Sequence, residues 1–399
     1  MKKSLIAVAV ASAFVAPAAM AEVTLSGAIN LGIEVAKSSA GTAGTSSLTR
    51  TLLNSNYSHV DLESVDDIGN GNKVIFHYQL FANPQNATGL NDANRNSFLG
   101  IAGGWGAFKM GTNENVYERM MYTADPLDGA LGPGGNLMIL GTPGASAAFQ
   151  AGQNVAVVGP QVDFYRRTDD TIWYESPNFS GFSFEVDYTL SAFKQNATTS
   201  PTGSSIDPKV ISVGGKFQPD GAPFYVDLSY ERHDDMFGLS AIAASNPAAT
   251  AGFATGSSSK DTGIQVGGGW QLGDLGLHLR YERLKYTEEG SALFTEYKRD
   301  AYWFAVKYNL PSGYVGAELG IARDGKANGT SVDNTGAKMF GIGYFHNLSK
   351  QSQLQFIYGR TDNKDNATYT QAGAPGDGTG TISPGSDSQV FHVGIKHTY

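Results

Sequence analysis

Residues 58–81, SHVDLESVDDIGNGNKVIFHYQLF, contain two alternating runs joined by a glycine-rich turn. In the second run every other residue is apolar, and these residues share one face of a strand: Val74, Phe76, Tyr78 and Leu80. In the first run the opposite, polar face carries His59, Asp61 and Glu63. The pattern predicts a β-hairpin with one apolar face, and leaves open whether that face meets a core or another environment.

The same period of two recurs along most of the chain, in runs such as FSFEVDY (182–188) and FYVDLSYE (224–231). Seven short turns rich in Gly, Pro, Asn or Asp separate pairs of runs, at 67–72, 103–106, 177–181, 217–223, 271–276, 309–313 and 346–350. Eight longer loops alternate with them, near 37–50, 82–95, 114–165, 191–209, 233–260, 287–297, 323–337 and 361–387. Strict alternation of turns and loops predicts 16 antiparallel strands.

This combination predicts an all-β fold, a 16-stranded antiparallel transmembrane β-barrel with short periplasmic turns and long outer loops. Hydrocarbon offers no hydrogen bonds, so a sheet that spans it must close on itself. A barrel of about this size encloses an aqueous channel. We therefore expect stability from the closed ladders and from packing between protomers rather than from a core. The alternative is a secreted β-sandwich or propeller, in which both sets of turns would vary in length.

The first 21 residues have the features of a secretory signal. Lys2 and Lys3 precede an apolar run from Leu5 to Val15, and Ala19-Met20-Ala21 predicts cleavage after Ala21. The predicted domains are thus a signal peptide, 1–21, and an outer-membrane barrel, 22–399. No later stretch approaches the roughly 18 apolar residues of a transmembrane helix.

Composition excludes several partners. The segment after Ala21 carries 26 basic and 37 acidic residues, which argues against a nucleic-acid partner. The chain has no cysteine, so it has no disulfide, thiol nucleophile or thiolate metal site. We expect no cofactor and no metal, and the divalent-cation loop spacing is absent from the sequence.

Four stretches resemble segments of the Gram-negative general porins, the trimeric 16-stranded family: EVTLSGAINLGIEV (22–35), DDIGNGNKVIFHYQL (66–80), RNSFLGIAGGWGAFKMG (95–111) and RTDDTIWYESPNFSGFSFEVDY (167–188). The last is the most specific. Between 190 and 385 the resemblance rests mainly on strand spacing. It implies a homotrimer in outer-membrane lipid and passive diffusion of ions and small hydrophilic solutes.

The resemblance also implies that the third loop folds into the lumen. That loop is the long segment from Glu114 to Tyr165, and its apolar residues could pack on a wall: Met120, Met121, Leu127, Leu137 and Ile139. The alternative is a disordered surface insertion. General porins oppose basic wall residues to acidic loop residues across this constriction. Here the implied wall residues are His59, Arg95, Arg166 and Arg167, and the implied loop residues are Glu114, Glu118, Asp125 and Asp128. Each could equally be a solvated surface charge.

Three departures from the family concern this constriction and the C-terminus. His59 and Thr112 stand where the family often has arginine, and the chain ends in Tyr399 rather than Phe. A mostly neutral imidazole replaces a fixed positive charge, and Asp61 and Glu63 join the lumen face. We therefore predict a weak cation preference.

The rival hypotheses are an outer-membrane barrel enzyme of the phospholipase or protease type and a non-conducting adhesin barrel. The sequence contains no G-x-S-x-G elbow, H-E-x-x-H run or P-loop. His77 and His278 fall on the lumen face of strands, where we interpret them as solvated wall residues rather than catalytic bases. We predict that the protein is not an enzyme.

Overall fold

The computed structural model describes residues 22–42, 44, 46–85, 90–91, 95–127, 133–144, 163–192, 194–198, 200, 203–245, 257–290, 294–371 and 382–399. The predicted signal peptide, 1–21, and the predicted site residue Asp128 lie outside these ranges. Within these ranges, no helix has both the length and the apolar character needed to cross a membrane.

In the first half of the chain the described residues form β1 (Glu22–Ser38), β2 (Leu48–Ser55), β3 (His59–Gly69), β4 (Asn72–Ala82), β5 (Leu90–Asn91), β6 (Ser97–Gly103), β7 (Gly106–Glu114), α2 (Val116–Tyr122), the 3-10 helix η2 (Asn136–Met138), β8 (Arg167–Glu175) and β9 (Phe182–Thr189). The second half holds β10 (Lys209–Phe217), β11 (Phe224–Asp234), α3 (Gly238–Ser245), β12 (Ser258–Leu272), β13 (Leu275–Glu289), β14 (Glu296–Leu310), β15 (Gly313–Ala322), β16 (Lys326–Ala327), β17 (Thr330–Ser331), β18 (Ala337–Asn347), β19 (Ser352–Asn363) and β20 (Ser388–Thr398).

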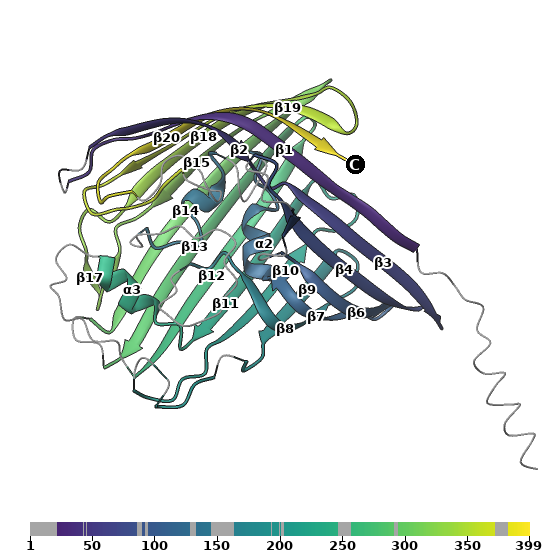
Figure 1. Ribbon diagram of the computed structural model, residues 1–399, viewed down its shortest axis with the longest axis horizontal. Helices are drawn as coiled ribbons and strands as arrows, with labels where there is room; N and C mark the ends of the chain where they lie inside the picture. The colour runs from purple at the N-terminus through teal and green to yellow at the C-terminus, as the bar shows by residue number, and fades with distance from the viewer. Residues whose placement is uncertain are drawn as a thin grey trace, which may run out of the picture.

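These strands form one closed barrel, drawn in Figure 1 with its strands oblique to the barrel axis. Two interrupted strands each appear as two segments, since β2 and β3 both pair with β1, and β5 and β6 both pair with β4. A small hairpin, β16–β17, belongs to the loop after β15. The barrel wall therefore has the predicted 16 strands. It closes where β1 pairs with β20, from Ala28 opposite Thr398 to Ser38 opposite Ser388.

The opening hairpin follows its predicted alternation. Leu62 of β3 lies opposite Tyr78 of β4, whereas Asp61 lies opposite Gln79 on the other face. Asn70 and Gly71 join the two strands with φ of 54° and 75°, the left-handed conformations that a two-residue hairpin turn requires.

One face of every long strand points outward and is mainly apolar between the two rims. Leucines and isoleucines on this face are about half exposed, among them Leu25, Ile33, Leu99, Leu228, Leu279, Leu319 and Ile395. A closed barrel with such an exterior is the form in which a β-sheet crosses a membrane. A single closed sheet also rules out the alternatives of a two-sheet sandwich and a propeller.

The two rims differ as the turn spacing predicted. All seven predicted short turns join consecutive strands, and four of the joins are only two residues long: 70–71, 104–105, 273–274 and 311–312. All eight predicted long loops connect strand ends at the opposite rim, and the longest separates β7 from β8.

The described residues of the third loop, 115–127, 133–144 and 163–166, fold into the lumen as predicted, and α2 appears inside the ring of strands in Figure 1. The packing of this loop against the wall corrects the expectation that the barrel would lack a core. Met121, Leu137 and Ile139 of the loop are almost fully buried against Tyr286 and Trp303 of the wall. Each such aliphatic side chain contributes roughly 1.5–3 kcal/mol when buried. The loop supplies a second layer, which alternation in the strands alone does not reveal.

Candidate functional site

Glycines on the lumen face of the wall make room for the third loop. A Cβ at Gly214 of β10 would lie 2.6 Å from Val116 and 2.8 Å from Met120, both in α2. A Cβ at Gly263 of β12 would lie 2.8 Å from both Phe164 and Tyr117. The loop backbone therefore approaches the sheet at positions where the sheet has no side chain.

The lumen-facing glycines that contact the third loop, here called the glycine track, begin with Gly214 and Gly263 and continue round the barrel to β19. A Cβ at Gly316 of β15 would lie 2.8 Å from Pro126, and one at Gly341 of β18 would lie 2.5 Å from Leu127. Further lumen-facing glycines meet the loop at Gly320, Gly343 and Gly359. The third loop thus covers the wall from β10 to β19.

A buried carboxylate anchors the loop to this wall. Glu282 of β13 accepts hydrogen bonds from the Tyr117 hydroxyl at 3.0 Å and from the Gly141 amide at 2.9 Å. Arg299 of β14 completes the set with a 2.8 Å ion pair to Glu282 and a 3.1 Å hydrogen bond to the Ile139 carbonyl. Arg299 and Glu282 are both fully buried, so each charge depends on the other.

Asp125 also serves the loop's own structure. Its two carboxylate oxygens accept hydrogen bonds from the Leu127 amide at 2.8 Å and the Asn136 amide at 2.7 Å. Its carboxyl group meets that of Glu318 on β15. Asp125 therefore lies on the covered side of the barrel, away from the predicted wall arginines.

Four of the predicted residues come together at the start of the third loop. Arg167 forms a buried ion pair with Glu114, and Asn96 accepts a further hydrogen bond from Arg167 at 3.2 Å. Arg95 packs on aromatic rings, 4.8 Å from the ring centres of both Tyr57 and Phe81. Arg95 is close enough to interact electrostatically with Arg167, Glu114 and Glu118. Burial and neighbouring Arg167 lower the pKa of Arg95 to about 10.

Glu118 lies in α2 and is 5% exposed. Burial and the nearby Glu114 carboxylate raise the pKa of Glu118 to about 8. Its carboxyl group is therefore protonated at neutral pH and adds no charge there.

Arg166 points differently from its neighbour. Its Nε donates to the Asp163 carbonyl at 2.9 Å, and its Nη1 lies 3.7 Å from the Met236 sulfur. The side chain is almost fully buried. Arg166 thus holds the end of the third loop to the region after β11, whereas Arg167 meets Glu114.

His59 belongs to a polar cluster on the uncovered wall. Asp61 lies between two imidazoles, 3.3 Å from Nε2 of His59 and 3.1 Å from Nε2 of His77. Gln79 donates a third hydrogen bond to Asp61 at 2.8 Å. His59 is additionally bonded through Nδ1 to the Tyr57 carbonyl at 2.9 Å.

Sequence reasoning missed the buried pairs that tie the structure together. Glu282 and Arg299 anchor the third loop, and Glu34 of β1 pairs with His392 of β20 at 2.9 Å beside the barrel closure. The alternation along each strand places these residues on the lumen face. Alternation does not say, however, which lumen-facing residues a loop will cover. Within the described residues no group of three or more His, Asp or Glu side chains could hold a metal ion.

A closed barrel of 16 strands, apolar outside and narrowed inside by its third loop, matches known proteins along its length. A family model described as "Gram-negative porin" matches residues 7–366. The chain belongs to the Gram-negative porin family. It is 27% identical to the outer membrane porin protein 32 of Delftia acidovorans, with 100% of both chains covered. It is 32% identical to a major outer membrane protein P.IB of Neisseria meningitidis serogroup B over 48% of this chain and 50% of that one.

Solved porin structures share the fold. The anion-selective porin from Comamonas acidovorans superposes with a TM-score of 0.71 at 22% identity, covering 95% of this chain and 100% of that one. The outer-membrane expressed OmpT of Vibrio cholerae gives 0.64 at 13% identity, covering 95% and 98%. The protein is therefore an outer-membrane porin whose barrel forms a channel.

Proposed function

We propose that this porin lets ions and small hydrophilic solutes diffuse passively through a lumen narrowed by the third loop, without chemical turnover. The observation that carries this proposal is the position of that loop: its described residues cover the lumen wall from β10 to β19 and leave the wall of His59 and Asp61 uncovered. We further propose that His59, Arg95 and Arg167 line the constriction opposite Glu114 and Glu118. Arg166 and Asp125 then act by holding the loop.

We also propose that the channel has a weak preference for cations. Arg167 is paired with Glu114, and the wall arginines are each at most 6% exposed, so little of their charge reaches the lumen water. On the uncovered wall the Glu63 side chain is 49% exposed, and its partner His77 carries charge only when protonated. Charged side chains around a constriction bias which ions pass. The Comamonas acidovorans porin is described as anion-selective, so this chain would differ from that relative.

Reversal potentials in a KCl gradient test the preference. We expect a small potential of the sign that indicates cations, and a shift toward anions in His59→Arg, because a fixed positive charge joins the constriction. His278→Arg is the matched control, since His278 faces the lumen on β13 away from this cluster. A clear anion preference of the unaltered protein would contradict the proposal.

Planar-bilayer recordings separate the porin from its rivals. Passive diffusion predicts discrete conductance steps from the purified protein. A barrel enzyme predicts hydrolysis of phospholipid or peptide instead, and an adhesin barrel predicts neither. The same preparation tests the homotrimer that we propose. One Vibrio cholerae OmpT structure of similar fold is described as a trimer form. Cross-linking should give a band of three chains, and lipid should copurify on the apolar exterior.

A further inference from the structure

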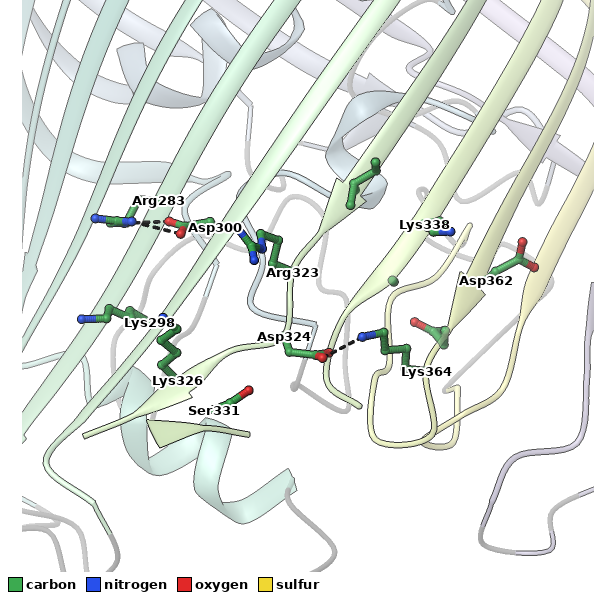
Figure 2. Close-up of a pocket in the computed structure, with 13 residues that line it drawn as sticks. Arg283, Lys298, Asp300, Arg323, Asp324, Lys326, Ser331, Lys338, Asp362 and Lys364 are labelled. Atoms are coloured by element: carbon green, nitrogen blue, oxygen red, sulfur yellow. Dashed lines mark hydrogen bonds and ion pairs between the residues drawn. The ribbon is translucent and has the colours of Figure 1, made fainter. Parts of the chain in front are cut away.

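A cationic pocket lies on the outward face of the barrel at the long-loop rim. Its cavity of about 610 Å³ is bordered by the ends of β13, β14, β15, β18 and β19 (Figure 2). Six of the lining side chains are basic, and three are acidic. The pocket faces away from the lumen, so the channel function does not use it.

The three acids do not neutralise all six cations. Asp300 is held by Arg283 at 2.6 Å, and Asp324 is held by Lys364 at 2.6 Å; Figure 2 shows both pairs. Asp362 is paired with Arg360, which lies outside the lining, at 2.6 Å.

Lys298 is paired with Glu296, which also lies outside the lining, at 3.4 Å. Three exposed cations therefore remain: Arg323, Lys326 and Lys338. No described carboxylate lies within ion-pair distance of any of them. Such a cluster, with one guanidinium and two ammonium groups, suits an anion with several oxygens, of which phosphate is the common biological example.

An apolar groove continues from this pocket toward the short-turn rim. Its cavity of about 450 Å³ runs over the outward face of β12 to β15, and Ile321 lines both cavities. Tyr302 and Leu319 border the groove, and Gly268 leaves a gap in the outward face of β12. A polar anion would not stabilise this surface, whereas a hydrocarbon chain would.

We propose that the pocket and the groove together bind a phosphate-bearing lipid of the outer leaflet. Its phosphate lies among Arg323, Lys326 and Lys338, and one acyl chain lies along Leu319 and Ile321. The long-loop rim faces the cell exterior in barrels of this kind, so the pocket lies at the depth of the outer-leaflet head groups. Each basic side chain at that depth contributes to the attraction of anionic lipid head groups.

The test compares ligands on the folded, full barrel in detergent micelles. Binding of phosphatidic acid is measured against diacylglycerol with the same chains and against inorganic phosphate. We expect phosphatidic acid to bind, and the variant Arg323→Gln/Lys326→Gln/Lys338→Gln to bind it about a hundredfold more weakly, from the typical contribution of each surface cation. Leu279→Trp fills the groove and should weaken phosphatidic acid binding as well.

A matched control removes the same charges from the same rim elsewhere. Lys209→Gln/Arg232→Gln/Lys260→Gln changes one arginine and two lysines on the outward ends of β10, β11 and β12. It should keep full binding, and all variants should keep the conductance of the original channel.

Three results would overturn the proposal. An equal loss in the control variant would mean non-specific attraction to a basic rim. Equal binding of inorganic phosphate and phosphatidic acid, unaffected by Leu279→Trp, would mean a free-anion site. A changed number of chains per particle in the pocket variant would mean that the pocket is a contact between copies of the chain.

Discussion

The lumen wall has two halves that share one sheet but differ in what faces inward. From β10 to β19 the wall presents glycines and buried aromatic residues to the third loop, as at Gly341 and Trp303. On β3 and β4 it presents His59, Asp61 and His77, which bond to one another instead of to the loop. Both halves alternate with a period of two.

The difference shows that alternation assigns a face but not its surroundings. A lumen-facing side chain meets water where the wall is bare, and a second protein layer where the loop lies. Ion pairs follow the same division, because Arg299 and Glu282 are completely buried under the loop, whereas His77 on the bare wall keeps a 20% exposed side chain. Substitutions on the two halves should therefore change different properties.

The largest effect should come from the anchor of the covered half. Arg299→Met leaves the Glu282 carboxylate buried without its cation, which typically costs about 3–5 kcal/mol. It also removes the hydrogen bond to the Ile139 carbonyl. We expect a lower denaturant midpoint and faster protease cleavage within the third loop. Arg299→Met/Glu282→Gln should recover much of the stability, and a double variant no better than the single one would contradict the argument.

A smaller effect should follow from filling the glycine track. Gly341→Leu places side-chain atoms where Leu127 and Gly134 now lie, and overpacking of this kind costs about 1–3 kcal/mol. We expect the loop to move off the wall and the single-channel conductance to change. Gly215→Leu is the control, because its Cβ would meet Phe182 at an ordinary 3.4 Å and away from the loop. Unchanged conductance in Gly341→Leu would mean that the loop position does not depend on this glycine.

The two halves of the wall also differ in how much of their structure the sequence predicts. Alternation and turn spacing predicted the strands, both rims and the barrel, since these depend on local residue order. The resemblance placed the third loop inside and brought Glu114 near Arg167. Neither predicted the Glu282–Arg299 anchor, because that pair depends on which wall the loop covers. One signal was available: Gly316, Gly320, Gly341 and Gly343 all fall on the lumen face, and glycine in a strand often marks a close backbone approach.

The smallest expected effect is a change of ion preference with pH, at the boundary between the halves. The pKa of Glu118 is raised to about 8 from its ordinary 4.5, so this carboxyl group is neutral at pH 7 and becomes negative as the pH rises through 8. Arg95, with its pKa of about 10, keeps most of its charge up to pH 9. The constriction therefore gains negative charge between pH 7 and pH 9.

Reversal potentials in a KCl gradient at these two pH values should show a stronger cation preference at pH 9. Glu118→Gln keeps the shape of the side chain but cannot ionise, so most of the pH dependence should disappear in that variant. If Glu118→Gln retains the full shift, the titrating group lies elsewhere on the bare wall, and the loop carboxyl group does not face the path of the ions.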